Sequence, residues 1–220
     1  CSSAASDVYK RQEFILFDKE YGLYENHEIL GEKGHFITSP LVSKHFSHCI
    51  AKHYIKESTF DTIVELGGGD ASLACDLLFY LKDKGGLPNK YIFFEKSDYL
   101  IKKQKSIISE KSISKLVDIS WVSDLKDLPN EAFIISNELF DCIPTDIIMH
   151  VPGGYQKAYI NDDYKLDWKK LNFKYDSAFT DLGLPKNLPN NYIFEYSYAQ
   201  RDIINEISEV LHRACFLIFD

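Results

Sequence analysis

"DTIVELGGGDASLACDLLFYL", residues 61–81, is the part of the sequence that decides the fold. The apolar run "TIVEL" is followed directly by three glycines, and apolar residues then recur at the spacing of a helix. A second apolar run, "YIFFE", comes next at residues 91–95. The order of strand, glycine turn, helix and strand predicts a βαβ unit with two parallel strands.

The same alternation continues on both sides of this unit. The periodicity predicts further helices at 36–56, 97–111 and 197–213, and further strands at 116–122, 132–138 and 215–219. After Pro144, "TDIIMHV" and "YQKAYI" flank the turn "PGG" as in an antiparallel hairpin, and 164–175 is expected to add a strand. We expect an α/β, Rossmann-like fold, with a mostly parallel sheet, helices on both faces and an inserted antiparallel hairpin.

Composition limits the classes of partner. The chain has 220 residues, of which 45% are hydrophobic, and a net charge of −8. This charge disfavours a broad surface for nucleic acid or for an anionic membrane, and favours small molecules or proteins as partners. The five cysteines form no CxxC pair, so the sequence indicates neither a disulfide framework nor a zinc knuckle. Because no apolar run approaches the roughly 18 residues of a membrane span and no secretory signal is recognised, we expect an intracellular protein.

The glycine turn limits the choice of cofactor. A dinucleotide fingerprint requires G-x-G-x-x-G; Gly67 and Gly69 fit it, but Ser72 occupies the sixth position. Glu65 would repel a pyrophosphate, whereas S-adenosylmethionine carries a sulfonium and an ammonium and no phosphate. The pattern therefore favours S-adenosylmethionine, with a merely tight connection between strand and helix as the alternative.

Acids at the ends of the next strands extend this hypothesis. Glu95 ends the second strand, where a carboxylate can accept two hydrogen bonds from ribose hydroxyls. Asp124 follows the third strand, where its loop could meet the adenine amino group. Trp121 could pack nearby or belong to the core. We expect Glu65 and Glu95 to lie beside the same glycine turn.

Several stretches together resemble the family of MidA-like class I methyltransferases, whose mitochondrial members look like arginine methyltransferases of respiratory complex I assembly. In chain order these stretches are "GEKGHFITSP" (31–40), "VELGGGDASL" (64–73), "EKSDYLIKKQ" (95–104), "ISWVSDL" (119–125) and "NELFDCIP" (137–144). The likeness runs from about Tyr21 to Asp220, and "NELFDCIP" and "GHFITSP" are far more specific than the glycine turn.

The resemblance implies a role for each matching position. Three residues would close over the cofactor from the N-terminal side: Gly34, Phe36 and Thr38. Four would hold it from below: Glu65, Gly67, Gly69 and Glu95. At the end of the fourth strand, where the methyl group would point towards its acceptor, are Asn137, Glu138 and Asp141, and Asn137 also contacts the cofactor. The sequence departs from the family pattern at His35, where Asp is usual, at Ala71, where glycine is frequent, and at its C-terminus, where the family continues.

An arginine acceptor explains why carboxylates would be needed. The guanidinium is protonated at physiological pH and its lone pairs are delocalised. Carboxylates that bind it by paired hydrogen bonds can orient one nitrogen and receive a proton after transfer. Glu138 and Asp141 are the predicted catalytic carboxylates, although acids here could also simply cap a short helix.

The ends of the chain lead to a prediction of its domains. Residues 1–12 resemble translated linker sequence and are expected to be non-native, residues 13–60 form a segment and helix that cover the cofactor, and residues 61–220 form the Rossmann-like methyltransferase domain. The final "RACFLIFD" is a strand with nothing beyond it, so we expect a fragment of a longer protein.

The alternatives that remain are a methyltransferase for another acceptor, a non-catalytic assembly factor that binds the cofactor, and a nicotinamide-dependent oxidoreductase. Residues His45, His48, Cys49 and His53 lie near one helix face in a pattern that could bind zinc, but no second cluster supplies partner ligands, so we expect no metal. The expected location is cytoplasmic for a bacterial protein and the mitochondrial matrix for a eukaryotic one.

Overall fold

The computed structural model describes residues 6–26, 43–57, 59–171, 179, 184 and 187–220. Two compact units make up the chain, and each is described by itself. Cys1–Ile15 and Ile143–Arg201 form the first, which we call the antiparallel unit, and Leu16–Cys142 and Asp202–Asp220 form the second, the parallel unit. This division differs from the three ranges expected from the sequence, which are a non-native linker, a segment that covers the cofactor and a methyltransferase domain, and those ranges stay a prediction.

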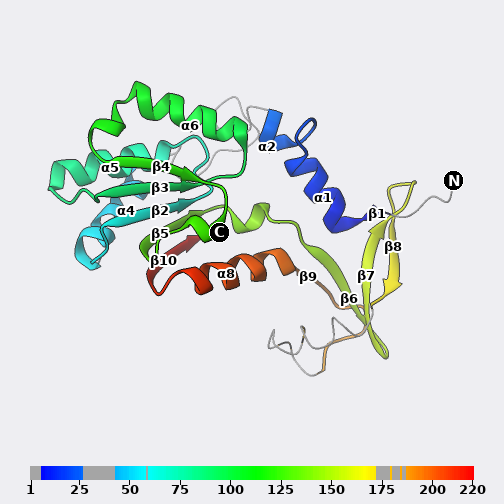
Figure 1. Cartoon of the computed structure of the whole chain (residues 1–220). Helices are drawn as coiled ribbons and strands as arrows, with labels where there is room; N and C mark the ends of the chain where they lie inside the picture. The colour runs from blue at the N-terminus through cyan, green and yellow to red at the C-terminus, as the bar shows by residue number, and fades with distance from the viewer. Residues whose placement is uncertain (1–5, 27–42, 58, 172–178, 180–183, 185–186) are drawn as a thin grey trace. The chain divides into compact units, whose positions relative to one another are not determined.

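The parallel unit is built on a five-stranded sheet with the order β10-β5-β2-β3-β4 (Figure 1). All neighbouring pairs are parallel. Its strands are β2 (Thr62–Leu66), β3 (Lys90–Phe94), β4 (Asp118–Val122), β5 (Glu131–Asn137) and β10 (Arg213–Phe219). Because all five run in one direction, the turns after β2, β3, β4 and β5 meet at the carboxyl edge of the sheet, where open α/β sheets bind their ligands.

Helices cover both faces of this sheet (Figure 1). One face packs under α4 (Lys44–Glu57), α5 (Ser72–Lys84) and α6 (Asp98–Glu110), which contribute Tyr54, Leu77 and Ile108 to one hydrophobic core. The other face packs against Ile207 of α8 (Tyr198–Val210) and against Leu211. Strands buried on both faces are apolar throughout, which is why "TIVEL" and "AFIIS" could be identified from sequence.

The expected fold class is confirmed, and most of the expected elements have counterparts within a few residues. The helix predicted at 36–56 corresponds to α4, although residues 36–42 lie outside the described part. The structure adds α1 (Val8–Phe17), α2 (Leu23–Asn26) and β9 (Ile193–Tyr196), none of which was predicted. β9 has four residues after a stretch rich in proline and asparagine, too short for a period of two to be recognised.

The antiparallel unit enlarges the predicted hairpin into a sheet of five strands with the order β1-β7-β6-β9, in which β8 also pairs with β7. Its strands are β1 (Ser6–Asp7), β6 (Asp146–Val151), β7 (Gly154–Ile160), β8 (Leu166–Lys170) and β9. The predicted hairpin is β6 and β7, and the predicted extra strand is β8. Aromatic rings fill the small core of this unit, in which Phe179 meets Tyr155, Phe194 and Tyr196 edge to face.

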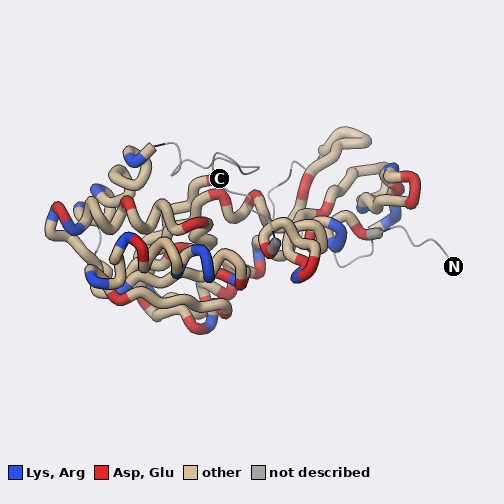
Figure 2. Tube along the Cα trace, turned by 90° about the horizontal axis from the view of Figure 1, so that it is seen from above, with Lys and Arg blue, Asp and Glu red and all other residues tan. Residues whose placement is uncertain are grey.

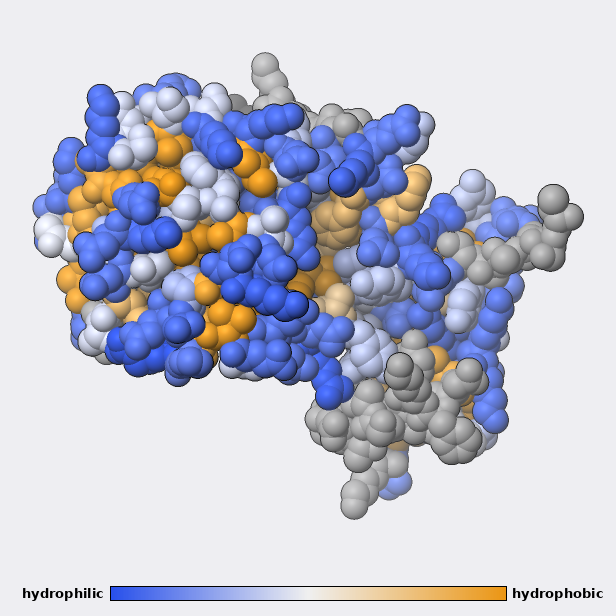
Figure 3. Space-filling model, viewed as in Figure 1, coloured by the Kyte–Doolittle hydropathy of each residue, from blue (hydrophilic) through white to orange (hydrophobic). Residues whose placement is uncertain are grey.

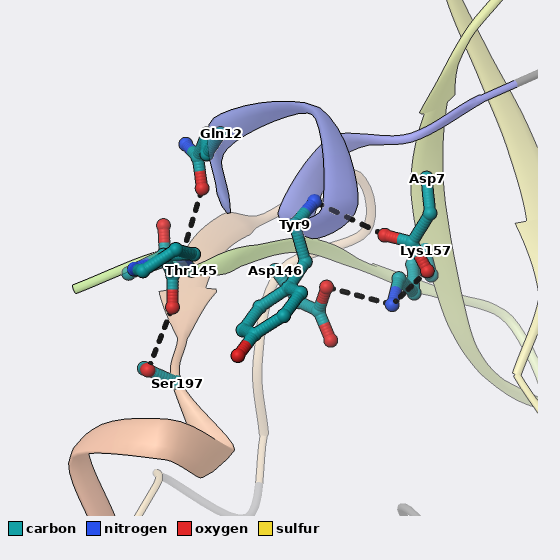
Figure 4. Close-up of polar contacts among 8 residues, drawn as sticks. Asp7, Tyr9, Gln12, Thr145, Asp146, Lys157 and Ser197 are labelled. Carbon is teal, nitrogen blue, oxygen red and sulfur yellow. Dashed lines mark hydrogen bonds and ion pairs between the residues drawn. The ribbon is translucent and has the colours of Figure 1, made fainter. Parts of the chain in front are cut away.

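A buried ion-pair cluster joins three strands of the antiparallel unit (Figure 4). Nζ of Lys157 lies 2.6 Å from Oδ1 of Asp146 and 2.9 Å from Oδ2 of Asp7, and the Lys157 side chain is only 7% exposed. Although burial alone would lower the pKa of Lys157, its two carboxylate partners raise it. Residues 6–12, which sequence reasoning set aside, thus take part in β1 and α1; their non-native origin stays a prediction.

Charge and hydropathy are mixed over the surface. Lysines and arginines alternate with acidic residues along the described elements (Figure 2). Hydrophobic side chains also reach the surface among the polar ones (Figure 3). In the parallel unit these include Ile55, Phe79 and Ile218, which are 45%, 38% and 48% exposed. Single exposed apolar side chains of this kind are usual on the surface of a folded domain.

Candidate functional site

The turn between β2 and α5 requires glycine for two different reasons. Gly67 and Gly69 have positive φ angles of 70° and 50°, which side chains disfavour. At Gly68 the limit is space, since a Cβ atom there would lie 2.4 Å from Cδ1 of the buried Phe93. Ala71, two residues after Gly69, also has a positive φ of 66° and precedes the first turn of α5.

Glu95 follows β3 and lies next to this turn. Its Oε1 accepts hydrogen bonds from the backbone N–H groups of Lys96 (2.9 Å) and Ser97 (3.0 Å). Its Oε2 accepts one from Nε2 of Gln104 (3.3 Å), which also donates to the carbonyl oxygen of Gly69 (3.0 Å). Burial raises the pKa of Glu95, and these three hydrogen bonds oppose the rise. The glycine turn and Glu95 therefore lie side by side, as the sequence predicted.

Glu65 lies elsewhere than expected. Its side chain is on the face of β2 that α5 covers, and its Oε2 accepts a hydrogen bond of 2.7 Å from the hydroxyl of the buried Tyr91. Burial raises its pKa to about 7, although the bond from Tyr91 lowers it. The carboxylate thus points into the interior beneath the turn and does not stand at an open site. The argument that Glu65 repels a diphosphate is not supported by this geometry, and its contact with a cofactor stays a prediction.

β4 and the loop after it contribute one half-buried and one exposed residue, Trp121 within the strand and Asp124 after it. Trp121 stacks on Phe93 with ring centroids 5.5 Å apart and donates from Nε1 to Oε1 of Gln104 (2.8 Å), so it is packed against the core. Asp124 is exposed, and its Oδ1 accepts a hydrogen bond from the backbone N–H of Lys126 (2.9 Å). With Lys96 and Lys126 it lines an open, polar hollow at the carboxyl edge of the sheet.

The loop after β5 carries the predicted catalytic residues. Asn137 ends the strand, Glu138 has a positive φ of 52°, and its N–H donates to the carbonyl oxygen of Phe219 (2.7 Å). Asp141 is exposed and lies in a single 3-10 turn, Phe140–Cys142. The two carboxylates are thus on one short loop, but Glu138 precedes the turn in a left-handed conformation and does not lie one α-helical turn from Asp141.

Two residues that sequence reasoning did not assign connect these loops. Gln104 is completely buried and joins the turn after β2, Glu95 and β4. Tyr24 of α2 accepts at its carbonyl oxygen from the Ser97 hydroxyl (2.8 Å), and its own hydroxyl lies 2.7 Å from Sγ of Cys142. Because Ser97 follows β3 and Cys142 follows β5, Tyr24 crosses the carboxyl end of β2, which lies between these strands.

Only Gln104 left a signal in the sequence. It occupies the middle of the buried stripe of α6, four residues from both Leu100 and Ile108, where an apolar side chain would be expected. Tyr24 is 118 residues from Cys142 in sequence, and no local pattern indicates that contact.

Gly34, Phe36 and Thr38 lie outside the described residues. For the zinc alternative, the described residues contain no group of three side chains that could hold a metal ion, and His48 packs against the Tyr80 ring with centroids 4.4 Å apart. Within the same residues, no helix is long and apolar enough to cross a membrane.

Comparisons with known proteins show what the chain is similar to. The model of the family described as "Putative S-adenosyl-L-methionine-dependent methyltransferase" matches residues 49–220. Among curated proteins, the chain is 31% identical to the human "Protein arginine methyltransferase NDUFAF7, mitochondrial", over 72% of this chain and 42% of that protein. The rat protein of the same name is 28% identical, over 68% of this chain and 40% of that protein. The chain thus spans about two fifths of the length of these relatives.

A solved structure shares the fold. It is a crystal structure of a Burkholderia thailandensis protein bound to S-adenosyl-homocysteine, with a TM-score of 0.79 and 19% sequence identity, and the match covers 96% of this chain and 57% of that one. Because the sequence identity is only 19%, the similarity to this structure shows a shared fold and nothing more. The match to the family model extends over most of the sequence, including the glycine turn, Glu95 and the loop after β5. The chain therefore belongs to this family of S-adenosyl-L-methionine-dependent methyltransferases.

Proposed function

We propose that this chain binds S-adenosyl-L-methionine at the carboxyl edge of the parallel sheet and transfers its methyl group to an arginine side chain of a protein. The family match supports the cofactor. The acceptor class rests on the relatives named protein arginine methyltransferases. Because these relatives are mitochondrial proteins, we also propose a mitochondrial location, and the family resemblance suggests a role in respiratory complex I assembly.

The observation that carries this proposal is the hydrogen bonding of Gln104 to both Gly69 and Glu95. These bonds bring the three glycines of the turn next to the Glu95 carboxylate, which still has an acceptor position for a further hydrogen bond. A carboxylate offers about four acceptor positions. Three of those on Glu95 are taken by described residues, so a position on Oε2 remains for a ribose hydroxyl. One open acceptor position fits a hydrogen bond from one ribose hydroxyl of a nucleoside, whereas the sequence led us to expect two such bonds.

The other cofactor contacts follow from position. Gly67 and Gly69 would allow the backbone to approach the cofactor closely. Asp124 would lie on the adenine side, and Asn137 would lie beside the methyl group. We retain Gly34, Phe36, Thr38 and Glu65 as proposed contacts from the family resemblance, and Trp121 from its position near the end of β4.

The chemistry needs little from the protein beyond position and charge. When bound, S-adenosyl-L-methionine supplies an electrophilic methyl group on a positively charged sulfur. The residues of the chain hold the acceptor nitrogen in line with that group and exclude water. Glu138 and Asp141 bind the guanidinium, orient one nitrogen and accept the proton that it releases.

A titration of the purified chain separates the alternatives. We expect saturable binding of S-adenosyl-L-methionine and S-adenosyl-homocysteine by calorimetry, no binding of NAD, and incorporation of methyl label into arginine when a mitochondrial protein extract is added. Binding of NAD alone would indicate an oxidoreductase and overturn the proposal. Binding of both adenosyl compounds without transfer to any protein would instead favour a non-catalytic assembly factor, and transfer to a small molecule would change the acceptor class.

A further inference from the structure

Gln104 is a buried polar side chain whose hydrogen-bonding groups all have partners. It is fully buried in α6, between the glycine turn and β4. Its Nε2 donates to the Gly69 carbonyl (3.0 Å) and to Oε2 of Glu95 (3.3 Å), and its Oε1 accepts from Nε1 of Trp121 (2.8 Å). A buried amide with unsatisfied groups would be destabilising, so these three bonds explain how the helix tolerates it.

The neighbours of Gln104 fix the direction of its amide. A flipped amide would place Oε1 against two acceptors, the Gly69 carbonyl and the Glu95 carboxylate, and Nε2 against the Trp121 N–H group. Only one orientation therefore satisfies all three partners. In this orientation Gln104 determines which part of Oε2 of Glu95 stays open to a ligand.

We propose that Gln104 is a positioning residue for S-adenosyl-L-methionine, one that holds the Glu95 carboxylate against the glycine turn so that its open acceptor position meets a ribose hydroxyl. This inference rests on the proposed function. Gln104 acts through Glu95 and Gly69 and does not itself touch the cofactor. Glu95 alone would be held only at Oε1, by the N–H groups of Lys96 and Ser97, and Oε2 would be free to turn away.

Two substitutions of similar volume test this role. Gln104→Met keeps the bulk of the side chain but removes every hydrogen bond, and Gln104→Glu places a carboxylate against Glu95. Loss of a hydrogen bond to a charged group corresponds to about a 10- to 100-fold change in an equilibrium constant. We expect both variants to bind S-adenosyl-homocysteine at least about 10-fold more weakly than the unaltered chain. Ile108→Val, on the same buried stripe, is the control; it should lower the melting temperature and leave affinity unchanged.

The pH profile of binding distinguishes positioning from a structural role. The bond from Gln104 lowers the pKa of Glu95, whereas burial and the negative charge of Glu25, in α2, raise it; Glu95 in turn acts on Glu65, in β2. Removing the bond in Gln104→Met should therefore move the acidic limit of S-adenosyl-homocysteine binding to higher pH. The profile of Ile108→Val should coincide with that of the unaltered chain, because a change of packing alone does not affect Glu95.

A second variant covers the case in which the Gln104 variants do not fold. Trp121→Phe keeps the stacking on Phe93 but removes the N–H donor to Oε1 of Gln104, and should weaken binding about threefold. Affinities of all folded variants within the error of the unaltered chain, with unshifted pH profiles, would overturn the inference and leave the proposed function standing. Failure of the unaltered chain to bind S-adenosyl-homocysteine would overturn both.

Discussion

The glycine turn after β2 and the loop after β5 are neighbours at the carboxyl edge of the parallel sheet, but they are built differently. Around the turn, the polar side chains are buried: Gln104, Glu65 and Glu95 are 0%, 3% and 8% exposed. On the loop, Glu138 is half-buried and Asp141 is exposed. The two sides touch at Gly67, where a Cβ atom would lie 3.0 Å from Cδ1 of Leu139.

This difference suits the two tasks proposed for these loops. Buried hydrogen bonds with fixed partners hold the proposed cofactor side in one geometry before any ligand arrives. On the side proposed to meet a protein, Asp141 is exposed and Glu138 is only half-buried. Substitutions at the turn should therefore act mainly on folding and on cofactor affinity, and substitutions on the loop mainly on methyl transfer.

Gly68→Ala should give the largest effect on the buried side. The new methyl carbon would meet the Phe93 ring at 2.4 Å, and Phe93 is itself fully buried, so the ring cannot move aside without disturbing the core. We expect a loss of about 3 kcal/mol in the free energy of unfolding, measured by urea denaturation. Gly85→Ala is the matched control, because Gly85 has a positive φ of 69° but nothing within 4 Å, and should lose only about 1 kcal/mol. Equal losses would mean that the turn does not pack on Phe93.

The buried carboxyl of Glu65 should make stability depend on pH. Its pKa is about 7 in the folded chain, against 4.5 when exposed, because burial disfavours the charged form. The folded chain then binds more protons between these values, so stability falls as the pH rises from about 4.5 to about 7 and is level above. At 1.36 kcal/mol per pKa unit, the loss is up to about 3 kcal/mol.

Glu65→Gln isolates this contribution. The amide oxygen can still accept the hydrogen bond from Tyr91, but the residue no longer titrates. Subtracting the pH profile of the variant from that of the unaltered chain removes the contribution of Glu95, whose pKa is also raised. A flat difference across pH 4.5 to 7 would show that Glu65 is exposed to water in solution.

The sequence predicted the parts of the site that depend on local pattern. The strands β2, β3 and β5, the three glycines and the position of Glu95 follow from short apolar runs, from the helical period of 3.6 between them and from turn chemistry. The direction of the Glu65 side chain could not be predicted. A strand buried on both faces is apolar on both, so its sequence does not show towards which layer of helices an acidic side chain points. Gln104 and Tyr24 were missed because their partners are distant in sequence, and residues 6–12 because an irregular pattern was taken for linker.

On the accessible side, Glu138→Gln combined with Asp141→Asn should lower methylation of an arginine-containing protein about 100-fold, since both the orientation of the guanidinium and the proton acceptor are lost. The affinity for S-adenosyl-homocysteine should change less than about twofold, because both residues are proposed to bind the acceptor and not the cofactor. Label transfer followed by amino-acid analysis measures the first quantity, and calorimetry the second. Asp118→Asn, exposed at the amino end of β4, is the control and should leave both unchanged. Unaltered transfer by the double variant would remove the catalytic assignment.

The smallest expected effect concerns Ala71, where the family pattern frequently has glycine. Its φ of 66° is unfavourable for alanine by about 1 kcal/mol, so Ala71→Gly should relieve strain. Loss of a buried methyl group, about 0.8 kcal/mol, and a more flexible unfolded chain offset that gain, and the stability should stay within about 0.5 kcal/mol of the unaltered chain.

Ala74→Gly provides the comparison for Ala71→Gly. Ala74 is equally buried but lies inside α5 with ordinary helical geometry, so its replacement loses the methyl group and helix propensity together, about 2 kcal/mol. The gap between the two variants in urea denaturation measures the strain at the end of the glycine turn. Equal losses would mean that Ala71 is not strained, and that the frequent glycine of the family is needed there for close approach to the cofactor rather than for backbone conformation.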